Sequence, residues 1–255
     1  MDLELKGRRA LVTGASRGIG RAIAEALAGE GAFVALCARG QAGVDEAVAA
    51  VEARGGRAYG EAFDVRDAAA MAGFVERSAE HMGGLDIVIS NVSTRPDAAG
   101  EERWRQAFDA DLLQHVRLAE LVLPKLASGQ QPCLVFIASI AAVMTQLLPE
   151  EVAYGAFKAG LVNYAGALAE RHGSRGVRVN TVSPGPIYFE GGAWDQYRQH
   201  KPKLYEMVQK LSALGRFGTP GDVARAVAFL ASPAASYITG ANLRVDGGTI
   251  KNTNF

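Results

Sequence analysis

The sequence predicts a three-layer α/β fold, in which a doubly wound parallel sheet of about seven strands lies between two layers of helices. Short apolar runs alternate with longer amphipathic segments along the chain, and Gly or Pro stands at most junctions. Such alternation is typical of a parallel sheet covered on both faces. No repeat or charged linker interrupts it, so we expect residues 1–255 to form one domain.

The elements can be placed in order by their apolar periodicity. We expect strands at residues 9–13, 32–38, 57–63, 85–90, 132–138, 177–182 and 243–245. We expect helices at residues 19–29, 44–54, 68–81, 101–126, 152–171 and 220–231. The irregular segment 187–218 is rich in aromatic residues and follows a candidate strand. Because doubly wound sheets bind ligands beyond the carboxyl ends of their strands, this segment is predicted to cover a site.

Bulk properties exclude several classes of function. Lys plus Arg and Asp plus Glu number 27 each, so no broad field attracts nucleic acid. The first residues carry two acids and no apolar signal region, and Ser139 interrupts the longest apolar stretch, so we expect a cytoplasmic protein without a membrane segment. Cys37 and Cys133 lie in apolar runs and are expected to be buried and inert, with no metal site.

A glycine-rich loop follows the first strand and leads directly into a helix. It reads Thr13-Gly14-Ala15-Ser16-Arg17-Gly18-Ile19-Gly20. Glycines allow positive φ and close backbone approach, while the helix N-terminus attracts phosphate. The spacing is GxxxGxG and not GxGxxG, but its place in the first strand–helix turn favours a Rossmann-type dinucleotide site over a turn without a ligand.

The choice of cofactor depends on the end of the second strand. Enzymes that use NAD place an acid about 20 residues past the glycines, to accept a hydrogen bond from the ribose 2′-hydroxyl. Here Arg39 stands 19 residues after Gly20. A guanidinium suits a 2′-phosphate, and Arg17 in the loop adds a second positive charge. We therefore predict that NADP(H) is preferred and that NAD(H) is an alternative.

A tyrosine and a lysine stand four residues apart on a predicted helix. Tyr154 and Lys158 therefore project from one face. Tyrosine titrates near pH ~10, so acid–base work at neutral pH requires a neighbouring positive charge. Ser139 follows the fifth predicted strand, 15 residues before Tyr154, where its hydroxyl could bind a substrate oxygen. Without further context, Tyr154 and Lys158 could equally be a solvent-facing pair on a helix, and Ser139 could be an ordinary turn serine.

Taken together in this order, the glycine loop, Ser139 and the Tyr154/Lys158 pair resemble the one-domain short-chain dehydrogenase/reductase family over nearly the whole chain. The resemblance implies that Tyr154 exchanges the proton, Lys158 holds the nicotinamide ribose, and Ser139 orients the carbonyl. Other residues match its cofactor contacts: Asp64 and Val65 at the adenine, Asn91 after the fourth strand, and Pro184, Gly185 and Ile187 at the nicotinamide.

Three positions depart from the family pattern. Ser93 stands where the family usually has glycine, in Ser90-Asn91-Val92-Ser93. Asp111 replaces the asparagine of the catalytic tetrad, and an ionised Asp cannot donate a hydrogen bond. Ile187-Tyr188-Phe189 replaces a segment that often contains threonine at the carboxamide.

These features leave three hypotheses for function. The first is reduction of a bulky apolar ketone, such as a 3-oxoacyl, polyketide or steroid-like substrate, with Met144, Leu147, Leu148 and the aromatic segment as the pocket. The second is a nucleotide-binding regulatory protein with degraded catalysis. The third is a sugar or polyol dehydrogenase. The resemblance also implies a homo-oligomer, a tetramer or dimer, built on helices around residues 112–126 and 152–171.

Overall fold

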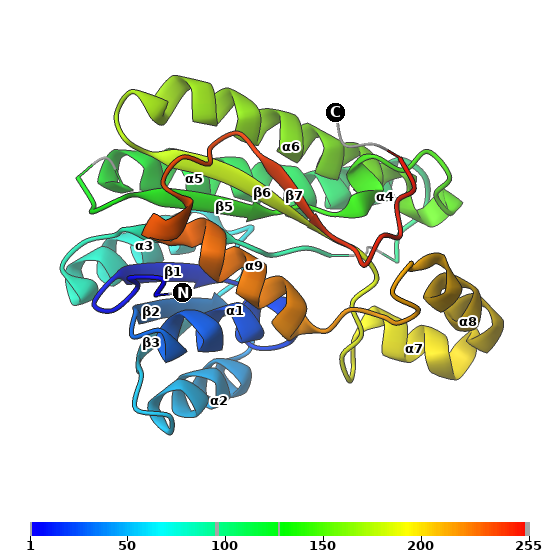
Figure 1. Cartoon of the computed structure of the whole chain (residues 1–255), viewed down its shortest axis with the longest axis horizontal. Coiled ribbons are helices and arrows are strands. Elements are labelled where there is room, and N and C mark those ends of the chain that lie inside the picture. Colours follow the sequence, from blue (N-terminus) through cyan, green and yellow to red (C-terminus); the bar gives the residue numbers. More distant parts are fainter. Residues whose placement is uncertain (1, 95–96, 127, 253–255) are drawn as a thin grey trace.

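The computed structural model describes residues 2–94, 97–126 and 128–252. Its centre is one parallel sheet with the strand order β3-β2-β1-β4-β5-β6-β7 (Figure 1). The strands are β1 (Arg9–Thr13), β2 (Phe33–Ala38), β3 (Arg57–Ala62), β4 (Ile87–Ser90), β5 (Cys133–Ile137), β6 (Arg178–Pro184) and β7 (Asn242–Val245). The predicted fold and all seven strands are confirmed, with ends that differ by at most two residues.

Helices cover both faces of the sheet because neighbouring strand residues point to opposite sides. Val12 of β1 packs in the core beneath α1 (Gly18–Gly29), α2 (Gln41–Glu52) and α9 (Pro220–Ala231). Leu11 packs in the other core, with α3 (Ala68–Met82), α5 (Gln114–Leu126) and α6 (Val152–Gly173). Burial on both faces explains why the strands read as continuous apolar runs.

The strand order reverses between β1 and β4, which is where doubly wound sheets bind ligands. The glycine loop leaves β1 at this point and Asn91 directly follows β4. Two segments far apart in sequence therefore meet at one edge of the sheet, as the prediction of a dinucleotide site requires.

The prediction of one continuous helix at residues 101–126 was wrong. The structure has α4 (Gly100–Phe108), then a π-helical turn at Asp109–Leu113, then α5. A π turn rotates the following side chains relative to an α-helix and is frequent at functional sites. Here it buries Ala110 and Asp111, while Phe108 stays exposed.

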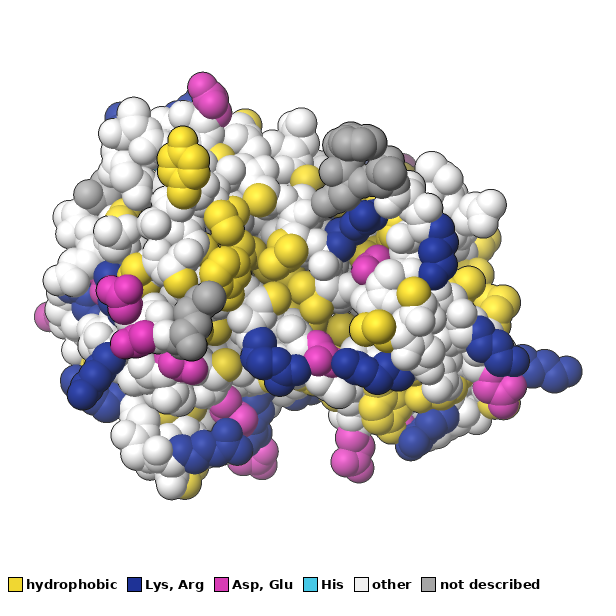
Figure 2. Space-filling model, viewed as in Figure 1, with side chains coloured by type: hydrophobic (Ala, Val, Ile, Leu, Met, Phe, Trp, Pro, Cys, Tyr) yellow, Lys and Arg dark blue, Asp and Glu magenta, His cyan; other side chains and the backbone are white. Residues whose placement is uncertain are grey.

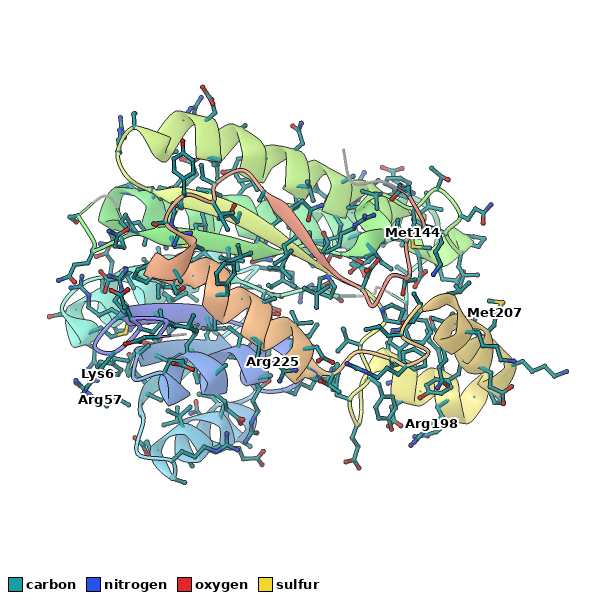
Figure 3. All side chains as sticks on the ribbon, viewed as in Figure 1. Lys6, Arg57, Met144, Arg198, Met207 and Arg225 are labelled. Atoms are coloured by element: carbon teal, nitrogen blue, oxygen red, sulfur yellow. The ribbon has the colours of Figure 1, made fainter. Side chains whose placement is uncertain are left out.

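The segment 187–218 contains two helices that the sequence analysis did not predict. They are α7 (Ala193–His200) and α8 (Pro202–Leu211), and Figure 1 shows them beyond the carboxyl ends of the strands. Arg198 and Met207 lie on their outer sides, away from the sheet (Figure 3). Short 3₁₀ turns complete the chain at Ile140–Ala142, Pro149–Glu151 and Pro233–Ala235.

Both cysteines are buried free thiols, as predicted, and burial raises the pKa of Cys37 to about 12. Within the described residues, no helix is both long and apolar enough to cross a membrane. Hydrophobic side chains are visible on the face where β7 and α9 lie (Figure 2). In β7, 36% of Leu243 is exposed.

Candidate active site

The loop between β1 and α1 brings backbone very close to backbone. Gly14 and Gly18 have φ of 68° and 58°, in the left-handed region that favours glycine. A Cβ on Gly20 would lie 2.3 Å from the carbonyl oxygen of Gly14. Arg17, the N-cap residue of α1, makes no side-chain capping bond to the helix. The first N–H groups of α1 therefore suit an anionic ligand, and the loop fits a dinucleotide pyrophosphate.

Asn91 fixes this loop from the neighbouring strand. Its side-chain amide donates to the carbonyl oxygens of Thr13 and Gly14, at 3.0 and 3.1 Å. Its backbone N–H donates to Thr13 Oγ1 at 3.0 Å. The side chain therefore supports the end of β1.

Two arginines expected at the adenine end are exposed. Arg39 follows β2, and Arg17 donates from its guanidinium to the Gly191 carbonyl at 3.3 Å. Asp64, after β3, accepts hydrogen bonds from the side chain and backbone of Arg66, which lowers the pKa of Asp64. The remaining predicted residues beside the loop are half-buried or buried: Ser16, Ile19 and Val65.

The turn that follows Ser139 packs closely against the start of α6, which carries Tyr154. Ser139 caps the 3₁₀ turn Ile140–Ala142, and its Oγ accepts from the Ala141 N–H at 3.1 Å. A Cβ on Gly155 would lie 3.0 Å from the Ala141 carbonyl oxygen, so α6 rests directly on this turn. Tyr154 is the residue before Gly155 and is half-buried. The glycine after the tyrosine thus allows the helix that carries Tyr154 to approach the turn that Ser139 caps.

Lys158 lies one turn further along α6 and is fully buried. Its Nζ is 5.8 Å from the centre of the Tyr154 ring and donates to the Ile137 carbonyl at 3.1 Å. Burial lowers the pKa of Lys158, and the carboxylate of Asp111 opposes that effect. Nζ lies 3.6 Å from Asp111 Oδ1, with only 1% and 0% of the two side chains exposed.

Asp111 has a partner that the sequence analysis did not predict. Ser93 Oγ donates to Asp111 Oδ1 at 2.6 Å, and the Thr94 N–H approaches the same oxygen at 3.4 Å. Burial raises the pKa of Asp111, whereas Lys158 and Ser93 act in the opposite direction. Two departures from the family pattern are therefore in direct contact.

Two buried polar residues at the start of α5 were not predicted from the sequence. His115 Nδ1 lies 2.6 Å from Ser90 Oγ, and burial, followed by Lys158, holds the pKa of His115 well below its usual range. Gln114 donates to the carbonyls of Val92 and Ala110. The only signal in the sequence was a polar pair three and four residues after Asp111.

The residues after β6 lie against the glycine loop. A Cβ on Gly185 would lie 2.7 Å from Asp246 Cα, so the Pro184-Gly185 turn needs glycine to pass the Asp246-Gly247-Gly248 turn. Ile187 is buried. The ring of Phe189 covers Gly18, since a Cβ there would be 2.7 Å from the ring.

Two polar residues of β6 hold the neighbouring strand β7 in place. The Asn180 side-chain amide donates to the Ile238 carbonyl, and the Ser183 hydroxyl donates to the Asn242 side-chain oxygen.

The comparisons with known proteins agree with this geometry. A family model described as enoyl-(acyl carrier protein) reductase matches residues 14–249. An isoepoxydon dehydrogenase of Penicillium expansum is 35% identical over 254 residues, which cover 98% of each chain. The chain belongs to the short-chain dehydrogenase/reductase family.

Two solved structures show the same fold over nearly the whole chain. L-sorbose reductase from Gluconobacter frateurii, complexed with NADPH and L-sorbose, is 30% identical with a TM-score of 0.89, covering 99% of this chain and 100% of the other. A 7α-hydroxysteroid dehydrogenase, complexed with NADH and 7-oxo glycochenodeoxycholic acid, is 26% identical with a TM-score of 0.90, covering 99% and 98%. This short-chain dehydrogenase/reductase is accordingly an NAD(P)-dependent oxidoreductase of the type that acts on CH–OH groups.

A pocket of about 290 Å³ opens beside Tyr154 of this short-chain dehydrogenase/reductase. Most of the described side chains that line it are polar: Asp97, Arg103, Glu150, Glu151, Gln196 and Tyr197, with Ala107, Ala153 and Ala193 between them. Met144, Leu147 and Leu148, the apolar residues expected to form a substrate pocket, are not among the described residues that line this one. Leu147 packs where a Cβ on Gly155 would be, and Leu148 is 37% exposed.

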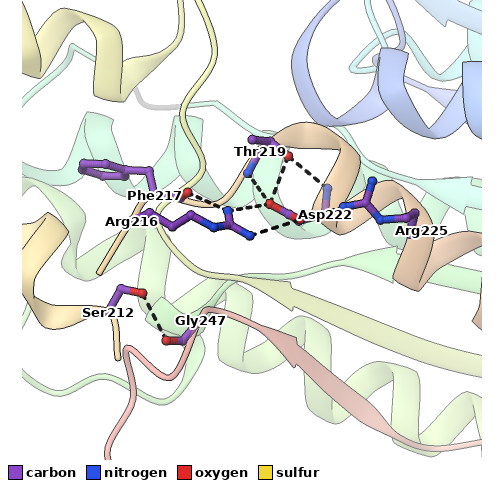
Figure 4. Close-up of polar contacts among 7 residues, drawn as sticks. All are labelled: Ser212, Arg216, Phe217, Thr219, Asp222, Arg225 and Gly247. Carbon is purple, nitrogen blue, oxygen red and sulfur yellow. Dashed lines mark hydrogen bonds and ion pairs between the residues drawn. The ribbon is translucent and has the colours of Figure 1, made fainter. Parts of the chain in front are cut away.

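The segment over the site is held by polar contacts at both ends. Asp195 accepts from the Tyr188 hydroxyl at 3.0 Å and from the Gly191 N–H at 3.0 Å, which fixes the turn that carries Phe189. At the other end, Asp222 accepts from Arg216, Thr219 and Arg225, and Ser212 donates to the Gly247 carbonyl (Figure 4). The aromatic residues expected to form the substrate pocket mostly pack on one another: Tyr188, Trp194, Tyr197, Tyr205 and Phe217.

Proposed function

We propose that this protein transfers a hydride between NADP(H) and a ketone or secondary alcohol, with Tyr154 exchanging the proton of the substrate oxygen. The observation that carries the proposal is a buried lysine ammonium one helical turn from a tyrosine that lines a pocket. Positive charge there favours the tyrosinate form. Ser139 accepts one hydrogen bond from the backbone, and its hydroxyl can still donate one to a substrate oxygen.

The nicotinamide cofactor supplies or accepts the hydride, and the protein's residues position the reactants. In this proposal Lys158 holds the nicotinamide ribose as well as acting on Tyr154, and Asp111 is the fourth polar member of the site. The other residues proposed to hold the cofactor are Gly14, Ser16, Arg17, Gly18, Ile19, Gly20, Arg39, Asp64, Val65, Asn91, Pro184, Gly185 and Ile187.

Preference for NADP(H) is supported by the two exposed arginines at the loop and at the end of β2. Arg17 and Arg39 can form charge-assisted hydrogen bonds with a 2′-phosphate. No acid stands at the end of β2 to accept from a free ribose hydroxyl. NAD(H) is the alternative, and relative rates with the two cofactors distinguish them.

The pocket favours a small hydroxylated carbonyl compound over the bulky apolar ketone that the sequence suggested. Charged and amide side chains around Tyr154 offer donors and acceptors to substrate hydroxyls, and apolar side chains that could bind a long acyl chain or a steroid ring are few in its described lining. The relative complexed with L-sorbose binds a substrate of this polar kind.

We also propose a cytoplasmic homo-oligomer. Trp104, Phe108 and Val152 are 43%, 39% and 44% exposed, and Phe157 contacts both aromatic rings, so α4 and α6 present one apolar face. An exposed apolar patch of this kind is typical of a subunit contact. Molar mass measured in solution tests it.

The function is tested by NADPH and NADH oxidation over a panel of matched polar and apolar ketones, with Tyr154→Phe as the control variant. We expect turnover with NADPH and polar ketones that the variant lacks. Equal turnover in both proteins contradicts the role of Tyr154. Binding of NADPH without turnover of any substrate would instead favour a nucleotide-binding regulatory protein.

A further inference from the structure

Two residues that depart from the family pattern form a contact with each other. Ser93 follows β4 and Asp111 lies in the π turn, 18 residues later, yet Ser93 Oγ is 2.6 Å from Asp111 Oδ1. Ser93 is exposed as a residue, but its hydroxyl is directed at the buried carboxyl group of Asp111. With glycine at residue 93 this hydrogen bond could not form.

The π turn aims the carboxyl group of Asp111 at the buried lysine of the site. Asp111 is fully buried, and its Oδ1 is 3.6 Å from Lys158 Nζ. The ammonium is also held by the Ile137 carbonyl at the end of β5. Oδ1 therefore lies between a serine hydroxyl and a lysine that acts on Tyr154.

The arrangement of donors favours an ionised Asp111. The Ser93 hydroxyl, the Thr94 N–H and the Lys158 ammonium all approach Oδ1. Burial opposes these donors by raising the pKa of Asp111, and among the described residues Oδ2 has no hydrogen-bond partner. Donors that converge on a carboxylate stabilise its charged form.

We propose that Asp111, oriented by Ser93, is a positioning residue that sets how much positive charge Lys158 presents to Tyr154. The proposal rests on the proposed role of Tyr154 in proton exchange. A carboxylate beside the ammonium offsets part of its field. Tyr154 then ionises at a higher pH than it would with a neutral amide at residue 111.

The other titratable groups around the pair do not replace this carboxylate. His115 on α5 is buried and neutral at physiological pH, because burial and Lys158 hold its pKa well below the usual range. On the pocket side, Tyr154 shares its surroundings with Arg103 of α4, with Glu150 and Glu151 of the turn before α6, and with Asp97. None of these changes when residue 111 is replaced.

The test is the ionisation of Tyr154 in ligand-free Asp111→Asn protein. Tyrosinate absorbance is titrated with pH, and the signal of Tyr154 is isolated by subtracting the titration of the matching Tyr154→Phe protein. We expect its midpoint to fall by about one pH unit, the size of the effect of a unit charge roughly 10 Å away at an effective dielectric constant of about 20. The pH profile of alcohol oxidation should move in the same direction by the same amount.

Ser93 provides a second, independent variant. Ser93→Ala removes a donor from the carboxylate, which then binds a proton more readily, and we expect a smaller shift in the same direction. Ser93→Thr keeps the hydroxyl and should restore the wild-type midpoint. Combined with Asp111→Asn, Ser93→Ala should add nothing further, because it acts only through that carboxylate.

Asp109→Asn is the matched control, since it removes a charge from the same π turn at a residue that is not fully buried. It should leave the midpoint unchanged. An unshifted midpoint in Asp111→Asn overturns the proposal, because an amide mimics a carboxyl group that is already protonated. If Asp111→Asn does not fold, the Ser93→Ala and Ser93→Thr pair decides in the same way. A shifted midpoint without turnover of any substrate would contradict the proposed function and leave this inference standing.

Discussion

Replacing Lys158 by methionine should destabilise the fold as well as stop catalysis. The substitution keeps a long apolar side chain but leaves the buried carboxyl group of Asp111 without its ammonium partner. Removing one member of a buried ion pair costs about 3–5 kcal/mol. The cost at pH 7 cannot exceed about 4 kcal/mol, because Asp111 can bind a proton instead. That value is the free energy of protonating, at pH 7, an aspartate whose ordinary pKa is near 4.

The sign of the pH dependence follows from the same carboxyl group. Without Lys158, burial leaves the folded-state pKa of Asp111 further above its unfolded value. Stability is then fully present at acidic pH, below the unfolded pKa, and is lost as the pH rises through the folded one. The Lys158→Met protein should therefore approach wild-type stability below about pH 4 and fall behind it toward pH 7.

Thermal unfolding across this pH range measures the effect. A loss of about 4 kcal/mol lowers the Tm at pH 7 by about 8–16 °C in a domain of this size. Adding Asp111→Asn should recover most of the stability without restoring turnover. Lys125→Met is a matched control, because its ion pair with Glu76 is partly exposed and worth less than about 1 kcal/mol. A deficit in Tm that does not vary with pH, or that Asp111→Asn does not relieve, would refute the ion-pair reasoning.

Three further predictions concern Arg39 after β2, Gly20 in the glycine loop and Asp222 in α9. Arg39→Ala should raise KM for NADPH about 10- to 100-fold, the equivalent of one charge-assisted hydrogen bond, and change KM for NADH little; an equal rise with both cofactors contradicts a 2′-phosphate contact. Gly20→Ala should abolish binding of NADPH measured by fluorescence, because its Cβ would lie 2.3 Å from a loop carbonyl, whereas Gly29→Ala in open space should bind normally. Asp222→Asn should cost about 1 kcal/mol above pH 4 by weakening the cap of α9. Because Arg216 lowers the pKa of Asp222, this contribution is lost in acid, so melting curves of variant and wild type should converge there.

The sheet, and the elements that carry the proposed site residues, could be predicted because their signals are local. Apolar runs such as that of β2 mark strands buried on both faces, and the glycine loop and the Tyr154/Lys158 pair each lie within one strand–helix turn or one helix. The π turn could not be predicted, since the apolar spacing continues through Asp109–Leu113. The change from α-helical to π-helical hydrogen bonding there leaves no mark in the residue pattern. The helices α7 and α8 were missed although their apolar residues follow a helical period, with Trp194 and Tyr197 three apart and Leu204, Val208 and Leu211 four and three apart. The segment was interpreted from its aromatic content alone, and its rings pack on one another across the two helices.

The contact between Ser93 and Asp111 illustrates what a single sequence cannot supply. Each residue alone looked like a weakening of the site. Their partnership depends on the end of β4 lying beside the π turn, which is a tertiary relation. The polar lining of the pocket beside Tyr154 could not be predicted for a similar reason, because it comes from three separate segments, while Leu147 packs toward Gly155.

The contact between Phe189 and Gly18 has a consequence for ligand affinities. It joins the covering segment to the loop that is proposed to hold the cofactor, and Arg17 adds a hydrogen bond to Gly191 across the same boundary. A ligand that orders the loop therefore also orders the segment over the substrate pocket. Thermodynamic linkage requires the reverse as well, so the cofactor and the substrate should raise each other's affinity by one common factor, transmitted through the Phe189 ring and the Arg17 hydrogen bond.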